Sequence, residues 1–247
     1  MERLAKEGGK PLLIGAIDYD NSIAGERGIT NSALLIGRDG NVVRKYDKTH
    51  RVPWGEYIPG RKFLPESIIK AIDMGRDLTP GTDYTPVKIG EHVRAGTAIC
   101  FEGVFGYVMR NFALRGANVL VVLSNDAWYP ESSEPEQHLA NAVMRAVETG
   151  LPMVRCGNNG GSLVVTPQGR ITQVLEVPGM ERRPELRRGR GFARVAVAVP
   201  ENPEATLFVR FGEWFVGVLA IFAAAWIFAG ISGFRSYRLS LLEKVQK

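Results

Sequence analysis

The stretch Gly96-Thr97-Ala98-Ile99-Cys100-Phe101-Glu102-Gly103 joins small and apolar residues to a cysteine, an aromatic ring and a carboxylate. Residues 95–99 are typical of the end of a buried strand, and 104–115 of a helix. A cysteine at such a turn is held rigidly, and the nearby helix N-terminus favours a thiolate. By itself the stretch favours a buried core cysteine, and Cys100 as a nucleophile is the alternative, which the rest of the chain then favours.

Strand and helix patterns alternate on both sides of this stretch. Asp39-Gly40 predicts a hairpin turn, and 18–30 a polar loop. This order predicts an α/β layered fold in which helices cover a mixed sheet. We expect helices at 63–74, 104–115 and 134–149, and strands at 11–17, 31–36, 42–46, 87–89, 95–99, 118–124, 153–156, 162–166, 170–177 and 192–199.

The composition and charge of the chain exclude several classes of function. The 247 residues suffice for one large globular domain, and the net charge of +5 is modest. An arginine cluster at 182–190 is interpreted as a solvated loop, with contact to anionic lipid as the alternative. No basic stripe is interleaved with aromatic residues, so we expect no nucleic-acid partner. The two cysteines and three histidines do not have zinc-ligand spacing, so we expect no metal and no cofactor.

Two polar and aromatic segments follow predicted strands. Residues 46–60 mix charge, aromatic rings, proline and glycine, which is typical of a structured loop that carries function. Lys48, at a strand end, is of the type that stabilises an oxyanion, and a solvated surface lysine is the alternative. Residues 125–129 follow the apolar run 118–124 in the same way.

The C-terminal segment is far more apolar than the rest of the chain. Residues 214–234 contain no charged side chain, and 21 helical residues extend about 31 Å, enough to cross a bilayer core. A buried core helix is the alternative. Arg235, Arg238, Lys244 and Lys247 follow the segment, and Glu213 precedes it. The positive-inside rule then places the C-terminus in the cytoplasm and the main domain outside.

Three motifs occur together in a fixed order: 46–57 (YDKTHRVPWGEY), Cys100-Phe101-Glu102 and 124–128 (SNDAW), followed by Gln137-His138 and 155–160. This set resembles the carbon–nitrogen hydrolase (nitrilase) domain of the bacterial apolipoprotein N-acyltransferase family. The resemblance runs from about residue 11 to the end of the chain. It implies an αββα sandwich over 1–205, a membrane helix at 212–235 and a cytoplasmic tail at 236–247.

The resemblance also implies a reaction. Cys100 takes an acyl chain from a phospholipid as a thioester, and the chain then passes to the N-terminal amine of a diacylglyceryl-cysteine lipoprotein. Lys48 stabilises the oxyanion and Glu56 orients the site. The implied location is the bacterial inner membrane, with the catalytic domain on its outer, periplasmic side. The residues expected to contact substrate are Phe101, Glu102, Trp54, Tyr57, Trp128 and Asn125, and for the three aromatic residues of the acyl entrance ordinary packing is the alternative.

The chain departs from this family in two respects. The family's general-base glutamate lies upstream of the lysine in a Pro-Glu context, which neither Glu2 nor Glu7 has. The upstream membrane helices are missing as well. Both departures are explained if a separate N-terminal membrane segment or subunit completes the protein. The alternatives are an amidase of the same superfamily and a catalytically incomplete, membrane-anchored remnant.

Overall fold

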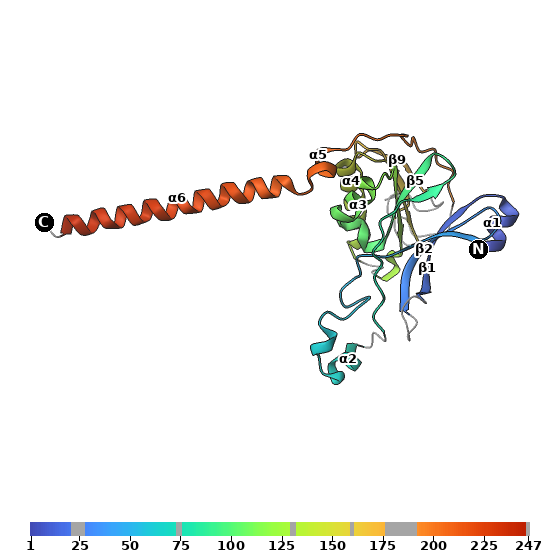
Figure 1. Ribbon diagram of the computed structural model, residues 1–247, viewed down its shortest axis with the longest axis horizontal. Coiled ribbons are helices and arrows are strands. Elements are labelled where there is room, and N and C mark those ends of the chain that lie inside the picture. The colour runs from blue at the N-terminus through green and yellow to red at the C-terminus, as the bar shows by residue number, and fades with distance from the viewer. Residues whose placement is uncertain (21–27, 73–75, 129–131, 159–160, 176–191, 246–247) are drawn as a thin grey trace. The chain divides into compact units, whose positions relative to one another are not determined.

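The computed structural model describes residues 1–20, 28–72, 76–128, 132–158, 161–175 and 192–245. The chain divides into two compact units, Met1–Val209 and Arg210–Lys247. The first unit contains two sheets with their helices, and most of the second is one long helix (Figure 1).

A three-stranded antiparallel sheet begins the first unit. It contains β1 (Leu12–Asp20), β2 (Gly28–Ile36) and β3 (Val42–Asp47), in that order. The predicted hairpin is confirmed, because the Gly37 amide donates to the Asn41 carbonyl at 2.8 Å. The predicted loop at 18–30 is too long, since β1 and β2 remain paired as far as Asp20 and Gly28. Polar residues are accommodated in these strands because they hydrogen-bond to the neighbouring strand. The Thr30 hydroxyl of β2, for example, donates to the Asp18 carbonyl of β1.

A six-stranded sheet forms the second layer. Its order is β4 (Val87–Ile89), β5 (Val93–Ile99), β6 (Val119–Ser124), β7 (Met153–Gly157), β8 (Leu163–Val165) and β9 (Ile171–Val174). The three middle strands, β5 to β7, run parallel, and the outer pairs are antiparallel. The continuous apolar run of β6 reflects its central place, where both faces of the strand are covered.

The two sheets contact each other through β2 with β5 and β1 with β6. Helices α3 (Gly106–Leu114) and α4 (Glu134–Thr149) pack against the six-stranded sheet (Figure 1). Phe112 of α3 packs so tightly that a Cβ on Gly96 of β5 would lie 2.6 Å from its Cβ. The fold is therefore a layered α/β arrangement in which two sheets contact each other and helices cover the larger one. The single mixed sheet that alternation alone predicted is wrong, because the first three strands form a sheet of their own.

Other predicted elements differ at their ends. A short helix α1 (Glu2–Gly8) was not predicted. In place of a helix at 63–74, a 3₁₀ turn η1 (Arg61–Phe63) precedes helix α2 (Glu66–Ile72), since Pro65 interrupts the backbone hydrogen bonding between them. The predicted strand at 192–199 is wrong: these residues pair with no strand in the described chain, and Phe192 is 89% exposed. The arginine cluster at 182–190 lies outside the described residues.

The C-terminal unit is dominated by α6 (Trp214–Val245), which follows the short helix α5 (Leu207–Phe211). Residues Trp214–Ile231 have a mean hydropathy of 2.2, and none of them is buried by protein. Eighteen helical residues extend about 27 Å, close to the thickness of a bilayer core. Within the described chain, this is the one helix long and apolar enough to cross a membrane.

Candidate active site

Cys100 lies where the parallel strands end. It follows Ile99 of β5 and opens the 3₁₀ turn η2 (Cys100–Val104), and its Sγ is 4.0 Å from the carbonyl of Asn125, which follows β6. Its φ of 52° is in the left-handed region, which costs a non-glycine residue about 1–3 kcal/mol. The side chain is half-buried, so the turn presents the thiol at the carboxyl ends of the strands, the usual place for ligands in such sheets.

Lys48 directly follows β3 of the other sheet. It is only 2% exposed, and its ammonium lies 2.9 Å from Glu56 Oε1. Glu56 also accepts from the Asn31 amide group at 3.0 Å and from the Val52 backbone at 2.8 Å. The interpretation of Lys48 as a solvated surface lysine is therefore wrong, and Glu56 fixes the position of its charge.

Glu102 connects the lysine loop to the cysteine turn. It is fully buried and accepts hydrogen bonds from the Thr49 and His50 amides at 2.7 and 2.9 Å. The Ile99 amide and the Tyr46 hydroxyl also donate to it, both at 2.9 Å. Burial raises the pKa of Glu102, and the backbone donors oppose that rise. These bonds hold the loop of Lys48 against the turn of Cys100, and the substrate-binding role expected for Glu102 stays a prediction.

A second network surrounds Asp126, at the start of the turn η3 (Asp126–Trp128). One carboxylate oxygen accepts from Ser124 and faces His138 Nδ1 at 3.4 Å; the other pairs with Arg155 at 2.5 Å. Asp126 and Arg155 are both almost completely buried. Burial acts against ionisation, but the hydrogen bond to His138 and the charge of Arg155 hold the pKa of Asp126 well below its ordinary range.

Sequence reasoning did not assign roles to Asp126, His138 or Arg155. Each of them lies in a quoted motif, so the signal was present in the spacing. Their function depends on a meeting of η3, α4 and β7, which are separate in the chain.

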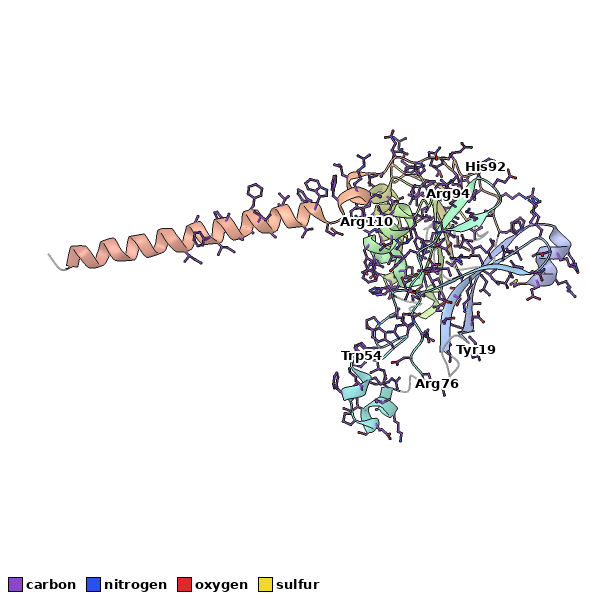
Figure 2. All side chains as sticks on the ribbon, viewed as in Figure 1. Tyr19, Trp54, Arg76, His92, Arg94 and Arg110 are labelled. Carbon is purple, nitrogen blue, oxygen red and sulfur yellow. The ribbon has the colours of Figure 1, made fainter. Side chains whose placement is uncertain are left out.

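The remaining predicted residues lie in different surroundings. Phe101 packs against His50 and Phe105, with ring centroids 5.9 and 4.9 Å apart. Trp54 is 55% exposed, and Figure 2 places it beside the segment that carries α2. The Tyr57 ring lies 4.3 Å under the Arg51 guanidinium. The Asn125 side chain is exposed and accepts from the Ala127 amide at 3.2 Å. The Trp128 side chain lies outside the described part.

Three side chains around Cys100 offer atoms that could bind a metal ion. Its sulfur, a ring nitrogen of His138 and an oxygen of Asp126 lie within 4.8 Å of one another. These atom types bind zinc. Both oxygens of Asp126 are already engaged, however, and the Arg155 charge opposes a cation at that carboxylate. The arrangement therefore fits an ion-pair and proton network better than a metal centre.

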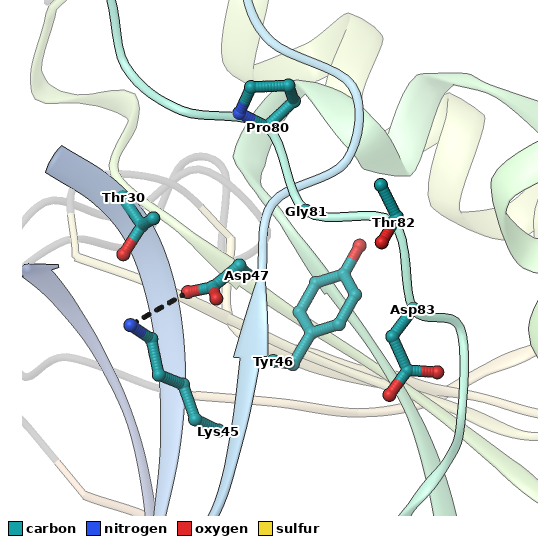
Figure 3. Close-up of a pocket in the computed structure, with 8 residues that line it drawn as sticks. All are labelled: Thr30, Lys45, Tyr46, Asp47, Pro80, Gly81, Thr82 and Asp83. Carbon is teal, nitrogen blue, oxygen red and sulfur yellow. Dashed lines mark ion pairs between the residues drawn. The ribbon is translucent and has the colours of Figure 1, made fainter. Parts of the chain in front are cut away.

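A separate cavity of about 250 Å³ lies beside β3. Lys45 and Asp47 form an ion pair of 3.2 Å at its wall (Figure 3). Gly81 closes it tightly, because a Cβ there would lie 2.1 Å from the Asp47 carbonyl oxygen. The residues that line the cavity include neither a cysteine nor a histidine, so it does not compete with Cys100 as the reaction site.

Comparison with known proteins agrees with this geometry. Residues 1–176 match the family model for carbon-nitrogen hydrolases. The chain belongs to the carbon-nitrogen hydrolase family. Among curated relatives, it is 39% identical over 141 residues to an apolipoprotein N-acyltransferase of Geobacter metallireducens, and 34% identical over 186 residues to that of Chlamydia trachomatis. These alignments cover 57% and 74% of this chain, but only 27% and 33% of the relatives, so the chain spans about a third of their length.

Solved structures of carbon-nitrogen hydrolases share the fold. A carbon-nitrogen hydrolase from Helicobacter pylori superposes with a TM-score of 0.52 at 21% identity, over 70% of this chain and 60% of that one. Nit3 of Saccharomyces cerevisiae, a member of branch 10 of the nitrilase superfamily, gives a TM-score of 0.51 at 20% identity, over 70% of this chain and 58% of that one. At these identities the likeness confirms the fold class.

Proposed function

We propose that this chain is the catalytic part of a membrane-anchored N-acyltransferase. It moves an acyl chain from a phospholipid, through a thioester on Cys100, to the N-terminal amine of a diacylglyceryl-cysteine lipoprotein. The observation that carries the proposal is the similarity to curated apolipoprotein N-acyltransferases, at 39% and 34% identity to the two compared above. Because the chain spans about a third of those relatives, the substrates are transferred from them as part of the proposal.

The site supports two successive acyl transfers. In the first, the sulfur of Cys100 attacks the ester carbonyl of the phospholipid and the lysophospholipid leaves. In the second, the lipoprotein amine attacks the thioester and the sulfur leaves, which divides one difficult step into two. Each passes through a tetrahedral oxyanion, and the ammonium of Lys48, fixed by its ion pair with Glu56, is the cation proposed to stabilise it. Glu56 holds that ammonium, and Glu102 holds its loop against the turn of Cys100.

Membrane anchoring fits α6 and the lipid substrate. A helix with 18 strongly apolar residues and no protein cover is stable in a bilayer, where those side chains leave water. We place the span at 212–235, the catalytic domain at 1–205 and the tail at 236–247. By analogy with the apolipoprotein N-acyltransferases we propose the bacterial inner membrane as its location, and the basic residues after the span favour a catalytic domain on the outer, periplasmic side. Phe101, Trp54, Tyr57, Trp128 and Asn125 remain proposed substrate contacts.

The general base expected from the family is not among the carboxylates described near Cys100. Glu56 is paired with Lys48, and Glu102 is surrounded by donors. Asp126 is paired with Arg155, and Glu134 faces the ring of His138 at 2.9 Å. We propose that a separate N-terminal membrane segment or subunit supplies that glutamate. The alternative of a catalytically incomplete remnant predicts that no such partner restores activity.

Trapping of the acyl-enzyme tests the proposal. Membranes that contain the chain, with and without an N-terminal partner, are incubated with alkyne-labelled phosphatidylethanolamine. We expect hydroxylamine-sensitive label on the chain, lost in Cys100→Ala and retained in the control Cys156→Ala. Label that survives Cys100→Ala, or its absence under both conditions, would overturn the proposal. Hydrolysis of a small amide without any label would favour the amidase alternative.

A further inference from the structure

The turn that presents Cys100 is held at both of its ends. At its start, the Ile99 amide donates to Glu102 Oε2 at 2.9 Å. At its end, Arg145 Nη1 donates to the carbonyl of Val104, the last residue of η2. A left-handed φ such as that of Cys100 persists only where the surrounding contacts determine it, so both anchors bear on the position of the thiol.

Arg145 belongs to helix α4, which packs against η2. It is 9% exposed, and its Nη2 pairs with Glu148 Oε1 at 2.5 Å. The pair is incompletely satisfied: Arg145 Nε and Glu148 Oε2 are buried and have no hydrogen-bond partner in the part of the chain that the structure describes. Buried atoms of this kind are costly, and in a native protein each of them calls for an explanation.

Residues 206–209 dock on α3 and α4 beside this ion pair. The Thr206 hydroxyl donates to the Glu148 carbonyl. A Cβ on Gly106, the first residue of α3, would lie 2.9 Å from the tip of the Phe208 ring and 3.0 Å from Glu148 Oε2. Only glycine leaves room for this approach, so the ring, the carboxylate and the start of α3 meet at one point.

Further contacts fix the same segment. The Phe208 carbonyl accepts from Arg110 Nε of α3 at 3.1 Å, and the Val209 amide donates to the Thr206 hydroxyl at 3.1 Å. Val209 is 3% exposed. The apolar helix α6 begins at Trp214, a few residues after Val209. The residues that lead into that helix are therefore built into the catalytic unit, next to the arginine that holds the turn of the nucleophile.

We propose that Arg145 is a positioning residue for Cys100, and that the docking of residues 206–209 holds Arg145 in place. The reactive turn then has its working shape only while the segment that leads to the membrane helix is docked. This role rests on the proposed function. Arg145 makes and breaks no bond, and the base remains the glutamate proposed to come from an N-terminal partner. A misplacement of about 1 Å at the thiol is enough to slow a reaction by about a hundredfold.

A simpler role for the pair is the stabilisation of α4, since Arg145 and Glu148 are three residues apart on that helix. Arg145, however, is buried and donates outside its own helix. The two roles differ in what a change in residues 206–209 does. Stabilisation of the helix alone predicts that truncation of Phe208 leaves η2 unaltered, whereas our proposal predicts that η2 loosens.

Hydrogen exchange tests the shape of the turn without any lipid substrate. The full chain in detergent is compared with Phe208→Ala and Thr206→Val, and exchange is followed by mass spectrometry in peptides that cover 99–105 and 119–124. We expect exchange in 99–105, which contains η2, to accelerate by about tenfold while that of strand β6 is unchanged. Val87→Ala truncates a buried residue of the outer strand β4 and, as the matched control, should leave 99–105 unchanged. Equal acceleration in both peptides, or none in 99–105, would overturn the proposal.

The kinetics of acyl-thioester formation separate positioning from binding. With the alkyne-labelled phospholipid and the N-terminal partner, Arg145→Met should lower the maximal rate by about a hundredfold and leave the half-saturating lipid concentration unchanged. Arg145→Lys retains the charge without the planar fork and should lose less. Phe208→Ala should lower the same rate but add little to Arg145→Met, because both changes act through one contact. Losses that multiply in the double variant would overturn the coupling.

The two measurements fail separately, because exchange in 99–105 does not depend on a substrate. Accelerated exchange in the variants, together with no thioester in the parent, would reject the proposed function alone. A parent that forms the thioester, together with unchanged exchange and unchanged rates in the Arg145 and Phe208 variants, would reject this inference alone.

Discussion

Two polar networks flank Cys100, and they are built differently. The lysine network (Lys48, Glu56 and Glu102) comes mainly from the loop after β3, and each carboxylate oxygen in it accepts a hydrogen bond. The aspartate network (Asp126, His138, Arg155 and Glu134) comes from η3, α4 and β7, and it includes a titratable imidazole and an oxygen without a described partner. A fully satisfied buried network rigidifies the structure around it, whereas a buried acceptor without a donor is costly.

The largest expected effect is on the stability of the aspartate network. Asp126→Asn leaves the Arg155 charge buried without its partner, so we expect the free energy of unfolding to fall by about 3–5 kcal/mol. Pulse proteolysis of the full chain in urea and detergent measures this. Glu66→Gln, in an exposed ion pair with Lys70, is the control and should change nothing measurable. A loss for Asp126→Asn as small as that of the control would show that the pair is not an anchor.

The ion pair between Asp126 and Arg155 also makes the free energy of unfolding depend on pH. Its surroundings lower the pKa of Asp126 below the ordinary 3.8, so the folded state favours the ionised form. The stabilisation is complete above the unfolded pKa and is lost as the pH falls from about 4 toward the folded value. Stability measured from pH 7 to pH 2 should therefore decline more steeply in the parent than in Asp126→Asn, and parallel curves would contradict this assignment.

The next largest effect is on catalysis by the lysine network. Lys48→Met removes a charge placed for the oxyanion, and we expect thioester formation to slow by about 10²–10³-fold. Lys45→Met is the matched control: Lys45 lies three residues earlier, pairs with Asp18 and Asp47 and borders the cavity of Figure 3. The control should retain its rate. Equal losses in both variants would mean that the charge acts through folding.

Glu102→Gln tests whether the lysine network is structural. The amide places an NH₂ group where a buried oxygen accepts backbone hydrogen bonds, so stability should fall by about 1.5–3 kcal/mol. The same urea proteolysis measures it, with the exposed Glu91→Gln as the control. A variant with full stability and reduced lipid transfer would instead support the substrate-binding role.

The smallest effect concerns the strained turn between the networks. Cys100→Gly should be more stable than Cys100→Ala by about 1 kcal/mol, because only glycine adopts a φ of 52° without cost. Cys156, in strand β7, should show the reverse order, since glycine weakens a strand. The same order at both sites would remove strain as the explanation.

Much of the fold was predictable because the strands have clear boundaries. The apolar run of β6, the Asp-Gly hairpin and helix α4, which is closed by Gly150 at a φ of 68°, lie close to the expected positions. The predictions failed where pairing with a neighbouring strand decides whether a segment is a strand. The ends of β1 and β2 are polar in sequence and form strands because they pair with each other. Residues 192–199 have a strand-like pattern, but they pair with no strand among the described residues.

By itself, the sequence determined the family motifs, the cysteine at a strand end, the buried strands and the apolar C-terminal helix. These features are local, since they depend on residue type and on spacing along one segment. Only the tertiary structure decided that Glu102 and Lys48 are buried and that His138 lies beside Cys100. Those facts depend on contacts between segments that are far apart in the chain. The Thr49 amide, for example, donates to a Glu102 oxygen across 53 residues, and residue spacing does not encode such a contact.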